Sequence, residues 1–252
     1  MDVATAVGLV ALALAVGVYG SIIGAGGGFL MVAGLVVIFD LSGATAVGTS
    51  VVTTLCIQAT GAFTYSRQGL VARPVALWFA VGSIPAALLS ALFLAGRLPD
   101  ATFEVLIGVL MLALAVFVLF RPAPREEDGH IAEPRRVELA TSGSLIGVLS
   151  GAFGVGSGLI TVPLLSRLQR LAAHRAAATT TLIGTLSGAA ATLGHTFAGN
   201  PRWSHVPFTV VGAVAGARLG ALNAVRLSAR TVLALLAAGL VAAGVALLIR
   251  HV

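Results

Sequence analysis

Residues 20–29 read GSIIGAGGGF and place five glycines within ten positions of an otherwise apolar run. A second cluster, GAFGVGSGL at residues 151–159, repeats the pattern 130 positions later, so that Gly24 matches Gly154. Glycine is a poor helix former because its backbone loses more conformational entropy on ordering than that of any other residue. Both clusters are therefore predicted to interrupt helices, and their apolar surroundings place the interruptions at membrane depth.

The composition of the 252-residue chain is that of an integral membrane protein, with 58% apolar and 10% charged residues and a mean hydropathy of +1.04. All fifteen basic residues are arginines, and they flank the apolar runs. Membrane topology therefore explains the basic charge better than nucleic-acid binding does. The only cysteine, Cys56, excludes an intramolecular disulfide and a multi-cysteine metal site. The lipid bilayer is the expected environment, and no cofactor is predicted.

Long uncharged runs mark the expected membrane segments, since a helix needs about 20 residues to cross. The first and the fifth run contain the glycine clusters and count as two segments each. The sequence thus predicts an all-α polytopic membrane protein with about five helical segments in each half. The runs cover residues 3–39, 41–66, 75–96, 105–120, 139–166, 176–201, 203–217 and 231–249.

The two halves are predicted to be copies of one unit. At the constant offset of 130, Gly26 and Gly28 match Gly156 and Gly158, and Thr49 matches Thr179. Shared membrane composition would give scattered matches rather than one register held across four segments. We therefore interpret residues 1–122 as repeat 1, residues 123–135 as a polar linker and residues 136–252 as repeat 2. Internal repeats are common in secondary transporters, whose binding site lies between them.

The arginines predict the orientation of these segments. Five segments per half put eleven loop arginines on one side and three on the other, whereas four per half would give eight against six. The positive-inside rule selects five, with the linker in the cytoplasm and both termini in the periplasm. An odd number of segments also inverts one repeat relative to the other. The larger set is Arg67, Arg73, Arg121, Arg125, Arg135, Arg136, Arg167, Arg170, Arg175, Arg226 and Arg230, and the smaller is Arg97, Arg202 and Arg250.

The length of the second glycine-broken run favours a hairpin that turns inside the membrane. Residues 139–166 would form about 42 Å of helix, whereas two full crossings need about 60 Å. We expect two hairpins that enter from opposite faces and carry their glycines at inward-reaching tips, although the sequence leaves full crossing open.

The glycine tips are candidates for an anion site, because free N–H groups at the start of a helix favour negative charge. The candidate donors are Gly26, Gly27, Gly28 and Phe29 at the first tip and Gly156, Ser157, Gly158 and Leu159 at the second. Close helix packing through small residues explains the same glycines equally well. The sequence does not decide between ligand contact and packing.

The segment after each cluster is unusually polar and supplies further candidates for substrate binding. They are Thr49, Ser50, Thr53 and Gln58 in the first half and Thr179, Thr180 and His195 in the second. Some of these hydroxyls are expected to bond carbonyls of their own helix, and a lone histidine is more often structural. Arg175 could draw anions or mark the cytoplasmic face, and Arg218 could serve the site or snorkel toward the cytoplasm. A carboxylate proton relay is unsupported, since no acidic residue lies in mid-segment.

The glycine clusters, the Thr49-Ser50 pair with its Thr179-Thr180 copy, and the chain length together resemble the TauE/SafE family of bacterial sulfite and organosulfonate exporters. Val162-Pro163 fits the pattern of that family after the glycines. The first copy departs from it with Val32-Ala33, and Ser157 replaces a glycine. The resemblance implies a carrier of small, often sulfur-containing anions in the bacterial inner membrane.

These observations predict a secondary transporter of a small anionic substrate such as sulfite, thiosulfate or an organosulfonate, working by alternating access. An anion channel with the glycine tips as its constriction and a non-transporting scaffold subunit are the alternatives. No enzyme is predicted, because the clusters lack the Lys-Ser/Thr of a phosphate-binding loop and no catalytic constellation is present. The oligomeric state stays open, a homo-oligomer included.

Overall fold

The computed structural model describes residues 2–97, 99–119, 134–154, 156, 158–224 and 227–249. Ten α-helices account for most of them, and none of these residues lies in a β-strand. The helices are α1 (Val3–Ile23), α2 (Gly28–Val37), α3 (Gly43–Arg67), α4 (Arg73–Phe93), α5 (Asp100–Leu119), α6 (Arg136–Phe153), α7 (Gly158–Leu168), α8 (Ala173–Phe197), α9 (Val206–Ala224) and α10 (Ala229–Ile249). Six of them, α1, α3, α4, α5, α8 and α9, are long and apolar enough to cross a membrane. The all-α fold predicted from the uncharged runs is confirmed.

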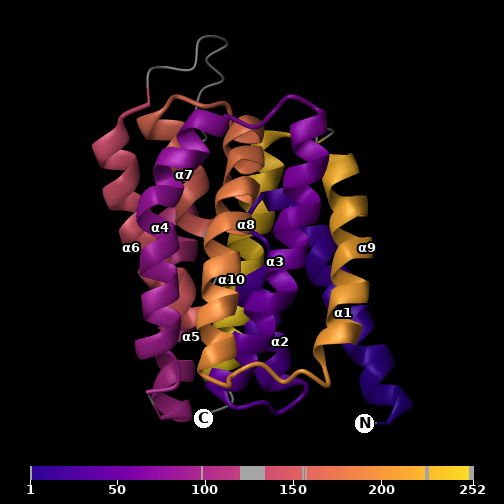
Figure 1. Cartoon of the computed structure of the whole chain (residues 1–252). Coiled ribbons are helices and arrows are strands. Elements are labelled where there is room, and N and C mark those ends of the chain that lie inside the picture. The colour runs from indigo at the N-terminus through magenta and orange to yellow at the C-terminus, as the bar shows by residue number, and fades with distance from the viewer. Residues whose placement is uncertain are drawn as a thin grey trace.

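The helices lie side by side along one common direction (Figure 1). In that view α1 begins and α10 ends at the lower end of the bundle, and α6 begins at the upper end. The α1–α2 hairpin therefore enters from below and the α6–α7 hairpin from above. With 10 and 11 residues, α2 and α7 are about 15 and 16 Å long, roughly half of a bilayer core. Both hairpins turn inside the bundle. The predicted linker, residues 123–135, lies outside the described residues except for Pro134 and Arg135.

The turn of the first hairpin depends on glycines in the left-handed region of backbone conformation. α1 ends at Gly24 (φ 69°), and Gly26 and Gly27 (φ 71° and 68°) lead directly into α2. Residues with a Cβ rarely adopt these angles, whereas glycine adopts them without steric cost. The cluster therefore reverses the chain within four residues.

The 130-residue register of the sequence recurs in the backbone. The helix α3 covers residues 43–67 and α8 covers residues 173–197, and α2 and α7 begin at Gly28 and Gly158. Residues with left-handed backbone pair at the same offset, namely Gly24 with Gly154, Gly26 with Gly156, Asp40 with Arg170 and Gly69 with Gly199. Each half of the chain thus folds into the same succession of helices and turns.

The tightest helix pairs join the two halves. α1 packs along α9, and α4 packs along α6. A Cβ added at Gly216 would collide with the carbonyl oxygen of Leu14, and one at Gly82 would collide with that of Ala140. Small residues thus bring the backbones of each pair into contact, as is common between membrane helices.

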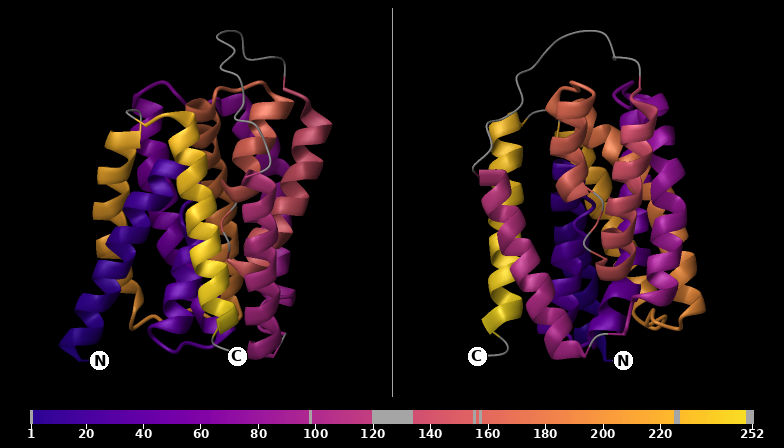
Figure 2. Two further views of the ribbon diagram at one scale, coloured as in Figure 1. Left: turned by 180° about the vertical axis from the view of Figure 1, so that it is seen from behind. Right: turned by 90° about the vertical axis from the view of Figure 1, so that its left-hand side faces the viewer.

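Of the remaining helices, α4 also packs against α8 and α3 against α9, and two pairs of equivalent helices pack together. α5 packs against α10 on one side of the bundle, where α5 is inclined relative to α10 (Figure 2). α3 packs against α8 at the centre. Their polar residues Thr49, Ser50, Thr53, Thr179 and Thr180 have no exposed surface. The polar segments predicted from the sequence therefore form the interior of the protein.

Gly82→Ala is predicted to destabilise the protein, because its methyl group would strike the Ala140 carbonyl and force α4 and α6 apart. Overpacking of this kind costs about 1–3 kcal/mol. Gly188→Ala is the matched control, since its Cβ would make only an ordinary 3.8 Å contact with Leu55. Thermal unfolding of the purified variants in detergent should show a lower Tm for Gly82→Ala alone. Equal midpoints would contradict the close packing of this pair.

Candidate functional site

The two glycine tips contact each other at the centre of the bundle. A Cβ added at Gly158 would collide with the backbone of Ala25, and one at Gly156 would lie 2.6 Å from the Ala25 carbonyl oxygen. The same added atom at Gly156 would be 3.7 Å from the backbone nitrogen of Gly28. The tip glycines therefore do pack closely, as one of the two interpretations of the sequence required. Ser157 lies outside the described residues.

This contact brings the starts of two helices together. The first hydrogen bond of α2 runs from the Met31 N–H to the Gly27 carbonyl at 3.0 Å. The N–H groups of Gly28 and Phe29 consequently have no acceptor within their own helix. α7 starts at Gly158 in the equivalent way. Each helix start carries roughly half a positive charge and free N–H groups, and the ends of α1 and α6 at the same tips carry a similar negative charge. Any attraction of an anion here therefore depends on hydrogen bonds from these N–H groups. Only the backbone of Phe29 can take part, because its side chain is buried against Tyr19.

A small polar cavity adjoins the tips. Its volume of about 10 Å³ is enough for about one water molecule. The cavity is lined by Val51, Thr54 and Gln58 of α3, Ser150 and Gly154 at the end of α6, Gly156, and Gly184 and Gly188 of α8. It therefore lies between the two polar helices and directly beside the second tip.

Gln58 is the most polar side chain of this cavity. It is 3% exposed, and its Oε1 has no hydrogen-bond partner. Its Nε2 lies 2.8 Å from the place where a Cβ on Gly26 would be, and a Cβ on Gly184 would collide with it. The first tip and α8 thus leave room for the amide by carrying glycine at both positions. An unpaired buried acceptor is costly, which marks Oε1 as a group that awaits a ligand or a water.

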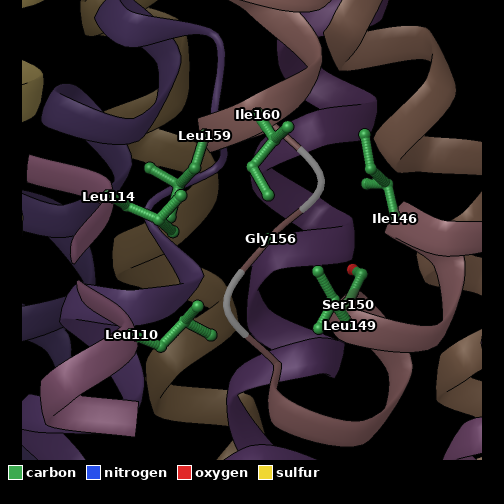
Figure 3. A pocket seen from close by; sticks show the side chains of 8 residues that line it. All are labelled: Leu110, Leu114, Ile146, Leu149, Ser150, Gly156, Leu159 and Ile160. Atoms are coloured by element: carbon green, nitrogen blue, oxygen red, sulfur yellow. The ribbon is translucent and has the colours of Figure 1, made fainter. Parts of the chain in front are cut away.

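A second cavity of about 10 Å³ also borders Gly156 and is mainly apolar. Figure 3 shows Gly156 between the side chains of Leu110 and Leu114 on one side and those of Ile146 and Ser150 on the other. Ser150 and Gly156 line both cavities. Gly156 therefore borders a polar and an apolar space.

Thr49 and Thr179 brace connections between the two halves. Thr49 Oγ1 accepts a hydrogen bond from the Arg202 N–H at 2.9 Å, and Thr179 Oγ1 accepts one from the Ala72 N–H at 3.0 Å. Both partners are also related by the offset of 130. Each hydroxyl thus binds the backbone of a loop in the opposite half. The sequence alone had suggested both positions for substrate binding.

The neighbouring hydroxyls differ between the halves. Ser50 Oγ donates to the Gly28 carbonyl at 3.1 Å and so contacts the first tip directly. The equivalent Thr180 is fully buried, and its Oγ1 has no partner. Thr53 donates to the Thr49 carbonyl at 2.9 Å and lies 2.7 Å from the Thr209 hydroxyl of α9.

His195 has a structural environment. Its Nε2 lies 2.8 Å from the Gly151 carbonyl oxygen, and its Nδ1 lies 3.0 Å from Asn200 Nδ2. The equivalent Tyr65 donates from its hydroxyl to the Ser21 carbonyl at 2.9 Å. Each side chain therefore braces the last turn of the helix that leads into a glycine tip, and His195 does not line the cavity.

Two arginine candidates lie away from the cavity. Arg175 stands at the start of α8, and its buried Nε has no partner. Nine residues separate it from Gly184, or about 13 Å along the helix. Arg218 is exposed on α9, as snorkelling predicts.

The structure thus brings together Gly26, Gly28, Ser50, Gln58, Gly156 and Gly158, and separates His195, Arg175 and Arg218 from them. Sequence reasoning missed six residues of the polar cavity, namely Val51, Thr54, Ser150, Gly154, Gly184 and Gly188. The glycine of α8 opposite a buried glutamine could have indicated Gly184, but nothing in the sequence distinguished Ser150.

Comparisons with known proteins agree with this architecture. The family model described as "Sulfite exporter TauE/SafE" matches residues 9–247. The chain is 26% identical over 247 residues to "Probable membrane transporter protein YunE" of Bacillus subtilis, covering 89% of this chain and 90% of that protein. It is 28% identical over 204 residues to "Probable membrane transporter protein y4hK" of Sinorhizobium fredii, covering 79% and 81%. No solved structure matches the chain.

Thr179→Val is predicted to lower stability by about 1–3 kcal/mol, because the isosteric change leaves the buried Ala72 N–H without an acceptor. Thr179→Ser keeps the hydroxyl and should restore most of the loss. The midpoint of unfolding in detergent measures both effects. Thr179→Val with unchanged stability and weakened substrate binding would instead assign the hydroxyl to the substrate.

Proposed function

Because the chain belongs to the TauE/SafE family, we propose that it is a secondary transporter of a small oxyanion, with sulfite, thiosulfate and organosulfonates as candidate substrates. The observation that carries this proposal is the meeting of two helix starts beside Gln58 at the centre of the bundle. N–H groups at such starts bind oxyanions without a charged side chain. Transporters with broken helices use the same device near the middle of the membrane.

We propose that the two halves are inverted repeats that give alternating access. The opposite entry of the hairpins (Figure 1) and the repeated backbone conformations support this arrangement. The proposed moving bodies are α1, α3 and α9 on one side and α4, α6 and α8 on the other, because α9 packs against α1 and α3, and α4 packs against α6 and α8. The bodies meet at α3 and α8, where the cavity lies.

The small size of the cavity favours a carrier over an open channel. About 10 Å³ is too little for an oxyanion, because it holds only about one water molecule. Admission of the substrate requires the tips or the two bodies to move apart. We interpret the structure as a closed state between the two accessible ones.

The arginines support an orientation with the upper end of Figure 1 in the cytoplasm of a bacterial cell, and both termini in the periplasm. Of the described loop and helix-end arginines, eight lie at the upper end and two at the lower end. The upper set is Arg67, Arg73, Arg135, Arg136, Arg167, Arg170, Arg175 and Arg230, and the lower set is Arg97 and Arg202. Arg121, Arg125, Arg226 and Arg250 lie outside the described residues. The excess of arginine is the cytoplasmic signature of a membrane protein.

Gly26→Ala is predicted to reduce transport about tenfold, the scale of one lost hydrogen bond to a charged group. The new methyl group would displace the Gln58 amide, which is 2.8 Å away. Gly69→Ala is the matched control, because it has the same φ of 71° and no atom within 4 Å of the added Cβ. Initial rates of labelled sulfite uptake into proteoliposomes measure the effect.

Saturation and counterflow in the same vesicles identify a carrier, and linear flux without counterflow would favour a channel. No flux of any anion would leave the scaffold alternative.

The orientation has a separate test with single cysteines in a Cys56→Ala background. Ala198→Cys and Gln68→Cys occupy equivalent exposed positions just after α8 and α3, at opposite ends of the bundle. A membrane-impermeant maleimide should label Ala198→Cys in intact cells, and Gln68→Cys only after permeabilisation. Labelling of both from one side would contradict the inverted arrangement.

A further inference from the structure

Building on the proposed function, we infer that the central site selects an oxyanion that still carries an acidic O–H group. For sulfite, the transported species is then hydrogensulfite and not the dianion. The unpaired, buried acceptor of Gln58 leads to this result.

The polar cavity offers hydrogen-bonding groups and no net charge. None of the residues that line it has a charged side chain. Each tip joins the end of one helix to the start of another, so the partial charges of α1 and α2, and of α6 and α7, nearly cancel. The site therefore distinguishes anions through hydrogen bonds.

Charged and titratable side chains of the described helices around the cavity do not line it. Cys56 and Tyr65 of α3, Tyr19 of α1, Glu138 of α6 and His195 of α8 are absent from the cavity wall. Tyr65 and His195 bind backbone carbonyls of the hairpins. The arginine nearest in sequence to the α8 part of the wall is Arg175, about 13 Å along the helix.

In the occupied site, where the ligand takes the place of a water, the Gln58 acceptor needs a donor from the ligand. Its Oε1 is buried and unpaired, while its Nε2 faces the glycines of the first tip and α8. When the backbone N–H groups of the tips bind the anionic oxygens, a ligand oxygen that faces Oε1 is a second acceptor unless it carries a hydrogen. Hydrogensulfite has anionic oxygens for the tips and one O–H for Gln58. A fully deprotonated oxyanion has no hydrogen to donate and would leave Oε1 unpaired.

The experiment compares three anions in proteoliposomes at a series of pH values, with protein-free vesicles subtracted for passive permeation. Uptake at fixed total sulfite should rise as the pH falls and follow the hydrogensulfite fraction. Methanesulfonate, a monoanion without an acidic proton, should be transported more slowly and with no pH dependence, which excludes titration of the protein as the cause. Sulfate, which stays a dianion in this range, should not be transported.

Gln58→Leu removes the acceptor at similar size and should lower the preference for hydrogensulfite over methanesulfonate about tenfold. The comparison of anions on the unaltered protein tests the inference even if this variant does not fold. Sulfate flux equal to sulfite flux, or sulfite flux that follows the dianion, would overturn the inference and leave the proposed function intact. The absence of saturable flux for every anion would instead overturn the proposed function itself.

Discussion

A backbone that leaves its helix inside a membrane has no water to bind, so protein groups must satisfy every main-chain N–H and C=O. The glycine tips meet this constraint partly by themselves, since the Gly26 N–H donates to the Gly20 carbonyl at 3.1 Å. Side chains of the polar helices supply the rest. Tyr65 and His195 bind the carbonyls of Ser21 and Gly151, and Ser50 binds that of Gly28. The polar side chains of α3 and α8 are thus needed in the first place to pair backbone groups that the broken helices leave without a partner. The donors at the helix starts are what remains for a ligand.

This requirement explains how far the sequence could predict the site. The two glycine clusters predicted two tips, because their glycines, their apolar surroundings and their constant offset of 130 residues all indicate helices broken at equivalent positions. Thr179 and His195 could not be assigned from the sequence. A buried hydroxyl or imidazole beside a broken helix can form the same hydrogen bonds with a substrate as with the backbone of a loop. The structure adds what the sequence cannot show, a loop or helix-end partner for each side chain in the Ala72 N–H and the Gly151 carbonyl. Arg218 was ambiguous for another reason, because the side of α9 that faces outward depends on packing.

The two halves differ in the residues that line the cavity. The residue equivalent to Gln58 is Gly188, and both line the same cavity. Gly184 is equivalent to Thr54, and a Cβ at Gly184 would already collide with the glutamine amide. If the halves are related as we propose, both copies line the same central space, which has room for only one large side chain. Duplication would then explain the similar arrangement of helices in the two halves. The substitution that placed Gln58 in one half only would explain why the cavity is asymmetric and polar.

A site built from neutral donors also suits release of the substrate. Conduction requires binding strong enough to admit an ion and weak enough to let it leave. An arginine in a closed cavity would hold an oxyanion through two charge-assisted hydrogen bonds, and it would remain as an unpaired buried charge after release. Helix starts avoid this penalty, because their partial charges belong to the fold and persist in the empty state. The described arginines other than Arg218 lie instead at the ends of the bundle, where they can raise the local concentration of anions without trapping one. A carrier that must return empty therefore gains from keeping full positive charge out of its centre.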